Sequence, residues 1–500
     1  MDLFANLGIG FDAVLTLANL GYCFLGVLLG TLIGVLPGLG PVATIAMLLP
    51  ATYGLPPLSA LIMLAGIYYG AQYGGSTTAI LVNLPGESSS VVTCLDGYAM
   101  ARQGRAGAAL GVAALGSFFA GTVATLLIAA AAAPLAEFAL KFGPAEYFSL
   151  MLLGLVAAVV LAQGDFFKAI AMVALGLALG LIGTDVNSGV ERFTFGFPEL
   201  ADGINFVVLS MGLFGIAEII ANLEHREKRE VFTQGIGSLW PSGRDLRASC
   251  KPVLRGAFLG SALGILPGGG AVLSSFTSYM LEKRLAKDPS RFGKGAIEGV
   301  AGPESANNAG AQTSFIPLLV MGLPSNAVMA LMVGAMMIHG IVPGPQVMSE
   351  RPGLFWGLIV SMWIGNVFLV LLNMPLIGIW VRLLEVPYRL LYPVILVFCC
   401  VGIYSVNNSA FDVGLALFFG LVGYLFIKLR CEPAPLLLGF VLGPMMEENL
   451  RRAMLLARGD ATVFFARPIS LCLLLFSLAL LLILVSPRAR ETREAAFREA

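Results

Sequence analysis

Charged residues are scarce in this chain. Asp, Glu, Lys and Arg make up 12% of the 500 residues, against about 25% in soluble domains, and the first basic residue is Arg102. The formal net charge is zero, so no nucleic-acid partner is expected. With 58% hydrophobic residues and a mean hydropathy of +0.87, the chain is predicted to be a polytopic membrane protein in a lipid bilayer.

Groups that bind metals or act as catalysts are also rare. The chain has two histidines, His225 and His339, and its seven cysteines form no Cys-x-x-C pair, so neither a metal site nor a cofactor is expected. A Walker A loop, a His-Glu-x-x-His motif and a nucleophile elbow are missing from the sequence. Transport driven by an ion gradient therefore fits better than ATP hydrolysis or covalent chemistry. A membrane-embedded enzyme acting on a lipid is the alternative from another class.

What the chain does contain is a series of apolar runs. Many approach the roughly 20 residues that cross a bilayer as a helix. We therefore expect an all-α fold with about a dozen transmembrane helices or half-helices. The clearest runs cover residues 106–133, 147–161, 169–182, 204–220, 354–372, 392–406, 411–427 and 469–485.

Basic residues collect in three segments, 224–255, 282–294 and 486–500, and the positive-inside rule places these in the cytoplasm. The N-terminus lacks the basic region and cleavage site of a signal peptide. The apolar run that ends in Glu447, Glu448, Arg451 and Arg452 is also expected to end at the cytoplasmic surface. The predicted organisation is a first membrane repeat (1–223), a cytoplasmic connecting loop (224–254), a second repeat with additional C-terminal helices (255–486) and a cytoplasmic tail (487–500).

A Pro-Gly break interrupts an apolar region twice. "GTLIGVLPGLGPV" (30–42) recurs as "GSALGILPGGGAV" (260–272), with Gly, Leu, Pro and Val at matching positions 230 residues apart. A looser match joins "YYGAQYGGSTTAILVNLPGES" (68–88) to "NNAGAQTSFIPLLVMGLPSNA" (307–327). The two halves therefore indicate an internal duplication.

The charges beside the two breaks differ. The second break lies between two basic segments, which is typical of a re-entrant hairpin with cytoplasmic ends, whereas the first returns into the uncharged stretch 51–60. Inverted repeats are the favoured interpretation, and parallel halves with kinked spanning helices are the alternative.

Open backbone at membrane depth must be buried in protein or line a wet cavity. A helix that restarts after such a break exposes N–H groups that suit a carboxylate, and glycine lets the backbone approach it closely. The alternative is that Gly and Pro serve helix packing and kinking. Nearby polar residues could bind the solute or a coupling cation, a proton or sodium, although Glu304 could equally be a carboxylate on a loop surface. The candidates for the coupling ion are Thr77, Asn83, Glu304 and Ser314.

Taken in order, the motifs "GTLIGVLPGLGPVATIAMLLP", "YYGAQYGGSTTAILVNLPGESSSVV", "GILPGGGA", "GPESANNA" and "LGPMMEENLRR" resemble the large membrane subunit of the tripartite tricarboxylate transporters, the TctA family. The resemblance implies a secondary importer of a small carboxylate in the bacterial inner membrane. It also implies two partners, a small four-helix membrane subunit and a periplasmic solute-binding protein. The implied site residues are Pro37, Gly38, Gly40, Gly74, Gly75 and Ser76 from the first half and Pro267, Gly268, Gly270, Asn307 and Asn308 from the second.

Family members take citrate, other tricarboxylates, tartrate or aromatic dicarboxylates, and the motifs do not distinguish among these solutes or between sodium and proton coupling. They also leave open the oligomeric state, the helix count and the side of the N-terminus. A stand-alone carboxylate carrier or channel without a binding protein is the second transport hypothesis.

Overall fold

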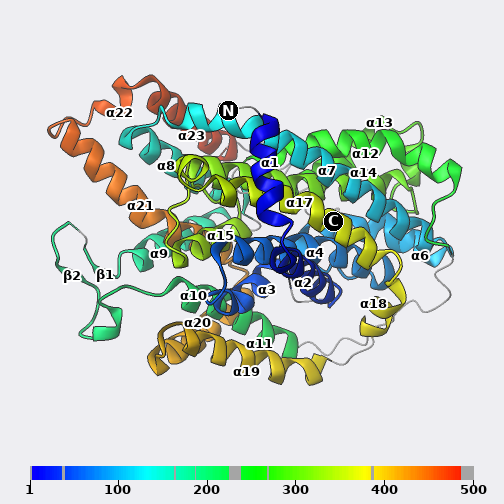
Figure 1. Ribbon diagram of the computed structural model, residues 1–500, viewed down its shortest axis with the longest axis horizontal. Helices are drawn as coiled ribbons and strands as arrows, with labels where there is room; N and C mark the ends of the chain where they lie inside the picture. The colour runs from blue at the N-terminus through cyan, green and yellow to red at the C-terminus, as the bar shows by residue number, and fades with distance from the viewer. Residues whose placement is uncertain are drawn as a thin grey trace.

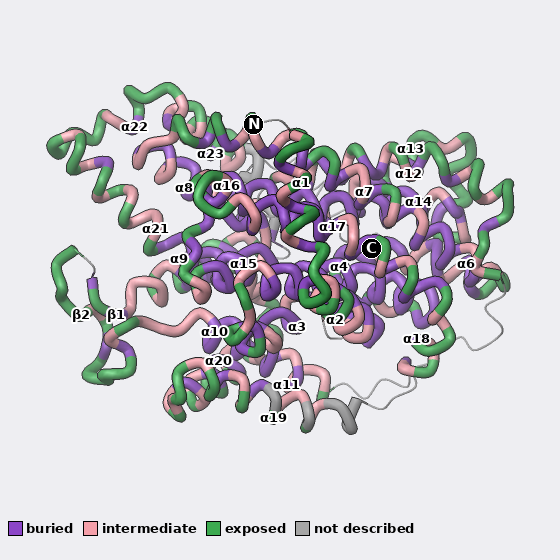
Figure 2. Tube along the Cα trace, viewed as in Figure 1, coloured by how far each residue is buried: buried purple, intermediate pink, exposed green. Residues whose placement is uncertain are grey.

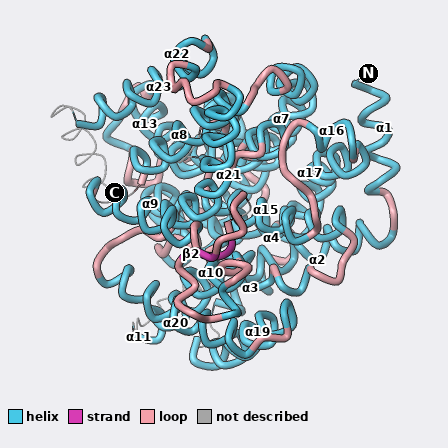
Figure 3. Tube along the Cα trace, turned by 90° about the vertical axis from the view of Figure 1, so that its left-hand side faces the viewer, coloured by secondary structure: helices cyan, strands magenta, loops and turns pink. Residues whose placement is uncertain are grey.

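A computed structural model describes residues 3–36, 40–162, 165–185, 187–224, 238–266, 270–384 and 388–485. These residues form helices, apart from loops and one small antiparallel hairpin (Figures 1 and 3). The hairpin pairs β1 (Gly183–Thr184) with β2 (Glu191–Arg192), with Gly183 opposite Arg192. The prediction of a helical fold is confirmed.

The helices of the first half precede the basic connecting segment. Three of them, α3, α4 and α8, begin with proline, whose missing N–H is tolerated in the first turn of a helix. The helices are α1 (Leu3–Val14), α2 (Leu17–Gly34), α3 (Pro41–Leu48), α4 (Pro57–Val82), α5 (Val91–Thr93), α6 (Ala99–Arg102), α7 (Ala106–Ala139), α8 (Pro144–Leu161), α9 (Phe166–Gly180), α10 (Phe206–Ser210) and α11 (Ala217–Glu224), with short 3₁₀ turns at Pro50–Thr52, Ser88–Ser90 and Pro198–Leu200 and π turns at Cys94–Tyr98 and Met211–Ile216.

The second half begins with α12, whose first turn is capped by the Ser242 hydroxyl. The helices are α12 (Gly243–Gly264), α13 (Gly270–Leu285), α14 (Glu298–Thr313), α15 (Ala327–Ile338), α16 (Gln346–Glu350), α17 (Pro352–Asn373), α18 (Ile377–Leu384), α19 (Tyr388–Asn407), α20 (Ala410–Lys428), α21 (Ala434–Leu456), α22 (Val463–Ala466) and α23 (Pro468–Val485), with a 3₁₀ turn at Pro289–Arg291 and a π turn at Pro317–Met321.

Five helical segments in the described part of the chain are long and apolar enough to cross a bilayer. The sequence leads us to expect about a dozen transmembrane helices or half-helices. Several other apolar helices are only 10–17 residues long, because breaks, caps and bends divide the apolar runs. The five long segments are Leu17–Gly34, Ala106–Ala139, Phe206–Glu224, Pro352–Asn373 and Ala410–Lys428.

Helices α2 and α4 pack so closely that only glycine fits on α2 at the contact. A Cβ built on Gly30 would lie 2.3 Å from the carbonyl oxygen of Ile67. Small residues four apart let two helix backbones approach in this way within membranes. The same contact joins Gly26 to Met63 and Gly34 to Ala71.

Helices α12 and α14 repeat this packing in the second half. A Cβ built on Gly260 would lie 2.2 Å from the carbonyl oxygen of Ala306. The glycines of α12 follow those of α2 by 230 residues, and their partners on α14 follow those on α4 by 239 residues. The flanking contacts join Gly256 to Gly302 and Gly264 to Gly310.

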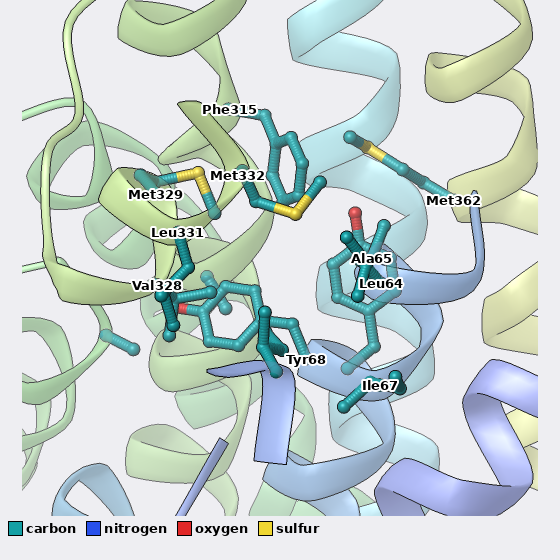
Figure 4. Packing of buried hydrophobic residues seen from close by; sticks show 14 of the residues in the cluster. Leu64, Ala65, Ile67, Tyr68, Phe315, Val328, Met329, Leu331, Met332 and Met362 are labelled. Carbon is teal, nitrogen blue, oxygen red and sulfur yellow. The ribbon is translucent and has the colours of Figure 1, made fainter. Parts of the chain in front are cut away.

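The partner helices α4 and α14 are the most enclosed elements of the molecule. Every residue of α4 from Ser59 onward is buried, and so is every residue of α14 from Gly299 onward. Figure 2 shows this buried centre, and Figure 4 shows Tyr68 of α4 in the same buried cluster as Phe315 and as Met329 and Met332 of α15. A helix that is enclosed on all sides can carry polar side chains only where partners or cavities receive them.

Two groups of charged residues lie at opposite ends of the longest axis of the molecule (Figure 1). At one end Arg105 pairs with Asp245 at 2.6 Å and Gln103 donates to the Lys294 carbonyl at 2.8 Å, so this end carries the basic loops. At the other end the hairpin lies beside α21. Within the hairpin, Arg192 of β2 contacts Asp185, the residue after β1, at 2.7 Å. The Ser188 hydroxyl, followed by Arg451 and Arg192, holds the pKa of Asp185 below its usual range.

The acidic and basic end of α21 lies beside the hairpin. Glu447 accepts from Arg192 at 3.1 Å and Arg451 contacts Asp185 at 3.1 Å, so this helix end lies with the hairpin, opposite the basic loops (Figure 1). Its position at the cytoplasmic surface stays a prediction.

Candidate functional site

A cavity of about 460 Å³ lies between the two halves of the chain. Two of its walls are the restarts of α3 and α13 after the Pro-Gly breaks, and two more are the Leu-Pro loops that follow α4 and precede α15. A volume of this size suits a small-molecule ligand. The corresponding lining segments are Gly40–Ala43, Gly270–Val272, Pro85–Ser88 and Asn326–Val328.

Three helices begin at this cavity. Helix α3 starts after Gly40, which has an extended backbone (φ −76°, ψ 171°), and α13 starts at Gly270, whose φ of +35° disfavours any residue with a Cβ. Helix α15 starts after Asn326, whose side-chain oxygen accepts from the Met329 N–H at 2.9 Å. The first N–H groups of a helix and its positive dipole end attract anions. A single ligand in the cavity could therefore contact the N-termini of several helices.

The two Leu-Pro loops have matching backbones. Asn83 ends α4 in the left-handed conformation (φ 59°), and Gly322, 239 residues later, ends the π turn at φ 73°. Each loop then restarts a helical segment, with Glu87 capping the first and Asn326 the second. An acidic residue thus stands in one half where the other half has an amide.

The cavity is acidic rather than basic. Glu87, Glu218 and Glu432 line it, and its described lining includes no Lys, Arg or His. The Ser89 hydroxyl donates to Glu87 and lies 2.9 Å from the side-chain oxygen of Gln72. An anionic ligand would therefore be held by backbone N–H groups and uncharged polar side chains, and not by a basic side chain of the described lining.

Sequence reasoning missed most of these polar lining residues. Tyr68, Gln72 and Glu87 lie inside the quoted motif 68–88, and Asn326 occupies the position that matches Glu87 in the looser repeat. The match between Glu87 and Asn326 in the looser repeat was the sequence signal that could have identified these residues as part of the site. For Glu218, the only signal was an acidic residue near the end of an apolar run.

The glycines predicted for the site divide into two groups. Gly40 and Gly270 line the cavity. A Cβ on Gly74 would lie 2.5 Å from the Thr31 carbonyl oxygen, so Gly74 packs α4 against α2, and Gly75 faces the side chain of Glu87. The predicted residues Pro37, Gly38, Pro267 and Gly268 lie outside the described residues.

The other predicted residues gather around a second cavity of about 20 Å³. Ser76, Thr77 and Glu304 line it, together with Ser117 of α7. Glu304 is fully buried inside α14 and not on a loop surface. Its carboxylate accepts from Ser76 at 2.5 Å and from Thr93.

Asn307 and Asn308 are buried next to this second cavity. The Asn308 side-chain nitrogen donates to the Ser117 hydroxyl at 2.8 Å and to the Asn307 side-chain oxygen at 2.6 Å. Asn308 therefore ties α14 to α7.

The remaining polar candidates lie apart from this cluster. Ser314 donates to the Ala311 carbonyl at 2.6 Å, and the Asn83 side chain is exposed at the end of α4. Thr78 donates to the Val35 carbonyl at 2.8 Å, which satisfies a carbonyl at the end of α2 where the helix stops. The structure thus separates the coupling-ion candidates into one cluster and two isolated positions.

Comparison with known proteins identifies the family of this chain. A sequence profile of the tripartite tricarboxylate transporter TctA family matches residues 20–438. An Agrobacterium vitis protein described as an uncharacterized 52.8 kDa protein in the TAR-I ttuC' 3' region is 60% identical over 499 residues, which cover all of this chain and 99% of the relative. A second A. vitis protein, from the TAR-II ttuC' 3' region, is 59% identical over 240 residues, which cover 48% of this chain and 99% of that relative.

No solved structure matches the chain. The profile covers most of the sequence, including both breaks and both Leu-Pro loops. The family name describes a transporter with further subunits, so the chain works within an assembly and is not an enzyme. The chain belongs to the tripartite tricarboxylate transporter TctA family, as its large multi-pass membrane subunit.

Proposed function

We propose that this chain is the permease subunit of a secondary active importer for a small carboxylate, of the tricarboxylate or dicarboxylate type. It lies in the bacterial inner membrane and works with a small four-helix membrane subunit and a periplasmic solute-binding protein, driven by a sodium or proton gradient. The observation that carries the proposal is the cavity of about 460 Å³ on which the matching helix restarts of both halves converge. Gly40 and Gly270 expose backbone there at equivalent positions.

Two features of the cavity support a carboxylate as the ligand. Separate helix starts at α3, α13 and α15 can each receive one carboxylate group of a di- or tricarboxylate. The acidic side chains that share the cavity favour transport together with a cation, since an anion alone would be repelled.

Uptake by reconstituted vesicles tests the proposal. Vesicles containing the chain and its small subunit are given a panel of radiolabelled carboxylates, with and without the binding protein, under an imposed sodium or proton gradient. We expect one carboxylate to accumulate, and uptake at low solute concentration to fall at least tenfold without the binding protein. Full uptake by the chain alone would favour the stand-alone carrier, and no uptake of any carboxylate would contradict the proposal.

The proposal includes inverted repeats, which single cysteines can test. In a cysteine-free background, Tyr53→Cys reports on the uncharged turn after α3, where Tyr53 is 55% exposed, and Ser290→Cys reports on the exposed basic loop after α13. A membrane-impermeant maleimide should label the two from opposite sides of the membrane, because the charge pattern places only the second loop in the cytoplasm. Labelling from the same side would support parallel halves instead.

A further inference from the structure

The small cavity beside Glu304 is large enough for one water molecule or one ion. Its volume is about 20 Å³, against the roughly 10–15 Å³ that a single water requires. It shares no lining residue with the larger cavity. Residues with side-chain oxygens line it from four helices, namely Ser76 and Thr77 of α4, Ser117 of α7, Glu304 of α14 and Asn373 of α17.

In the part of the chain that the structure describes, Glu304 is surrounded by hydroxyl groups and has no counter-charge. Ser76 and Thr93 donate to its two carboxylate oxygens, and Ser117 donates to its backbone carbonyl at 3.2 Å. Within the described residues, no Lys, Arg or His pairs with Glu304 or lines the cavity. A buried carboxylate is normally neutralised by a proton, a metal ion or a basic side chain.

The titratable groups on the neighbouring elements do not provide that charge. Tyr73 of α4, Cys94 of the π turn and Glu87 of the Leu-Pro loop are close enough to feel the charge of Glu304, and each is neutral or negative.

Four other ionisable residues on elements packed against α14 form two hydrogen-bonded pairs. Asp96 accepts from Tyr279 at 3.0 Å, and Arg255 of α12 donates to Glu282 of α13 at 2.7 Å. Among the residues that the structure describes, none therefore supplies a positive charge at Glu304.

We infer that Glu304, with Ser76, Thr77 and Ser117, binds the coupling cation, a proton or a sodium ion. The inference rests on the proposed function, because a coupling site has meaning only in a gradient-driven transporter. Helix α4 connects the cation site to the substrate cavity. Gln72 of α4 lines the larger cavity, and the Ser76 hydroxyl, one turn later on α4, lies 3.0 Å from the Gln72 carbonyl oxygen. Loading the cation site fixes the turn of α4 that faces the substrate.

Substitution of the carboxylate and of its hydroxyl partners tests this inference in vesicles with the complete transporter. Glu304→Gln should lower gradient-driven uptake at least tenfold. Ser76→Ala and Thr93→Val each remove one hydrogen bond that stabilises the charged carboxylate, so each should shift the half-saturating cation concentration about tenfold. The shift is downward for a proton, which a less stabilised carboxylate binds more tightly, and upward for sodium in Ser76→Ala, which removes an oxygen that lines the cation cavity. Glu224→Gln is the control, because the Glu224 carboxylate pairs with Lys428 at the surface.

A sodium gradient at constant pH and a pH gradient without sodium distinguish the two cations. Unchanged cation dependence in Glu304→Gln would overturn the inference. If that variant fails to fold, an unchanged half-saturating concentration in both hydroxyl variants would overturn it equally. Wild-type protein that takes up no carboxylate under either gradient would contradict the proposed function instead.

Discussion

Gly30→Ala is expected to prevent normal folding, although alanine is the better helix former. Its Cβ would lie 2.3 Å from the Ile67 carbonyl oxygen and 2.7 Å from the Ile67 Cα. Because both are backbone atoms, α2 and α4 would have to separate, which costs about 3 kcal/mol or more for an overpacked site. Gly260→Ala should have the same effect in the second half, where the Cβ would lie 2.2 Å from the Ala306 carbonyl oxygen.

Helix α2 provides its own control. A Cβ on Gly21 meets nothing within 4 Å, so Gly21→Ala should keep wild-type stability or gain up to about 1 kcal/mol through helix propensity. The measurement is the yield of monodisperse protein in detergent and its thermal unfolding midpoint. Equal stability of Gly30→Ala and Gly21→Ala would show that α2 and α4 do not pack as closely as the structure indicates.

The duplicated motif could be identified from sequence because helix breakers are costly at membrane depth and therefore conspicuous. Sequence alone did not separate the glycines that line the site from those that pack helices. Gly30 and Gly74 pack helices, whereas Gly40 faces a cavity. Only the neighbouring helix decides between these roles, and sequence spacing does not identify that helix.

The role of the acidic residues, like that of the glycines, depends on neighbouring helices that the sequence does not identify. Glu304 could be a loop carboxylate or a buried one, since the surrounding sequence is rich in small and polar residues. In the structure these small residues let α12 and α13 approach α14 closely, and hydroxyl groups of α4, α5 and α7 enclose Glu304. Glu87 was not predicted as a site residue because it lines the same cavity as Gly40 and Gly270, and segments distant in the sequence form that cavity.

Gly40→Leu is expected to abolish uptake without destabilising the protein. A Cβ on Gly40 meets nothing within 4 Å and Gly40 lines the larger cavity, so a leucine side chain can extend into the space that the substrate would occupy. The extended backbone of Gly40 is accessible to any residue, whereas Gly270 is a poorer test because its φ of +35° would add strain. Gly54→Leu is the matched control, since Gly54 is exposed, meets nothing within 4 Å and lies outside the cavity lining.

Uptake and the thermal unfolding midpoint should be measured together for Gly40→Leu and Gly54→Leu. We expect both variants to unfold within a few degrees of wild type, because a Cβ at either position meets no described atom within 4 Å. Uptake by Gly40→Leu should fall at least tenfold, equivalent to about 1.4 kcal/mol of lost binding free energy, while Gly54→Leu transports normally. Wild-type uptake by stable Gly40→Leu protein would mean that the carboxylate binds elsewhere, and that the restart of α3 at this cavity serves helix packing alone.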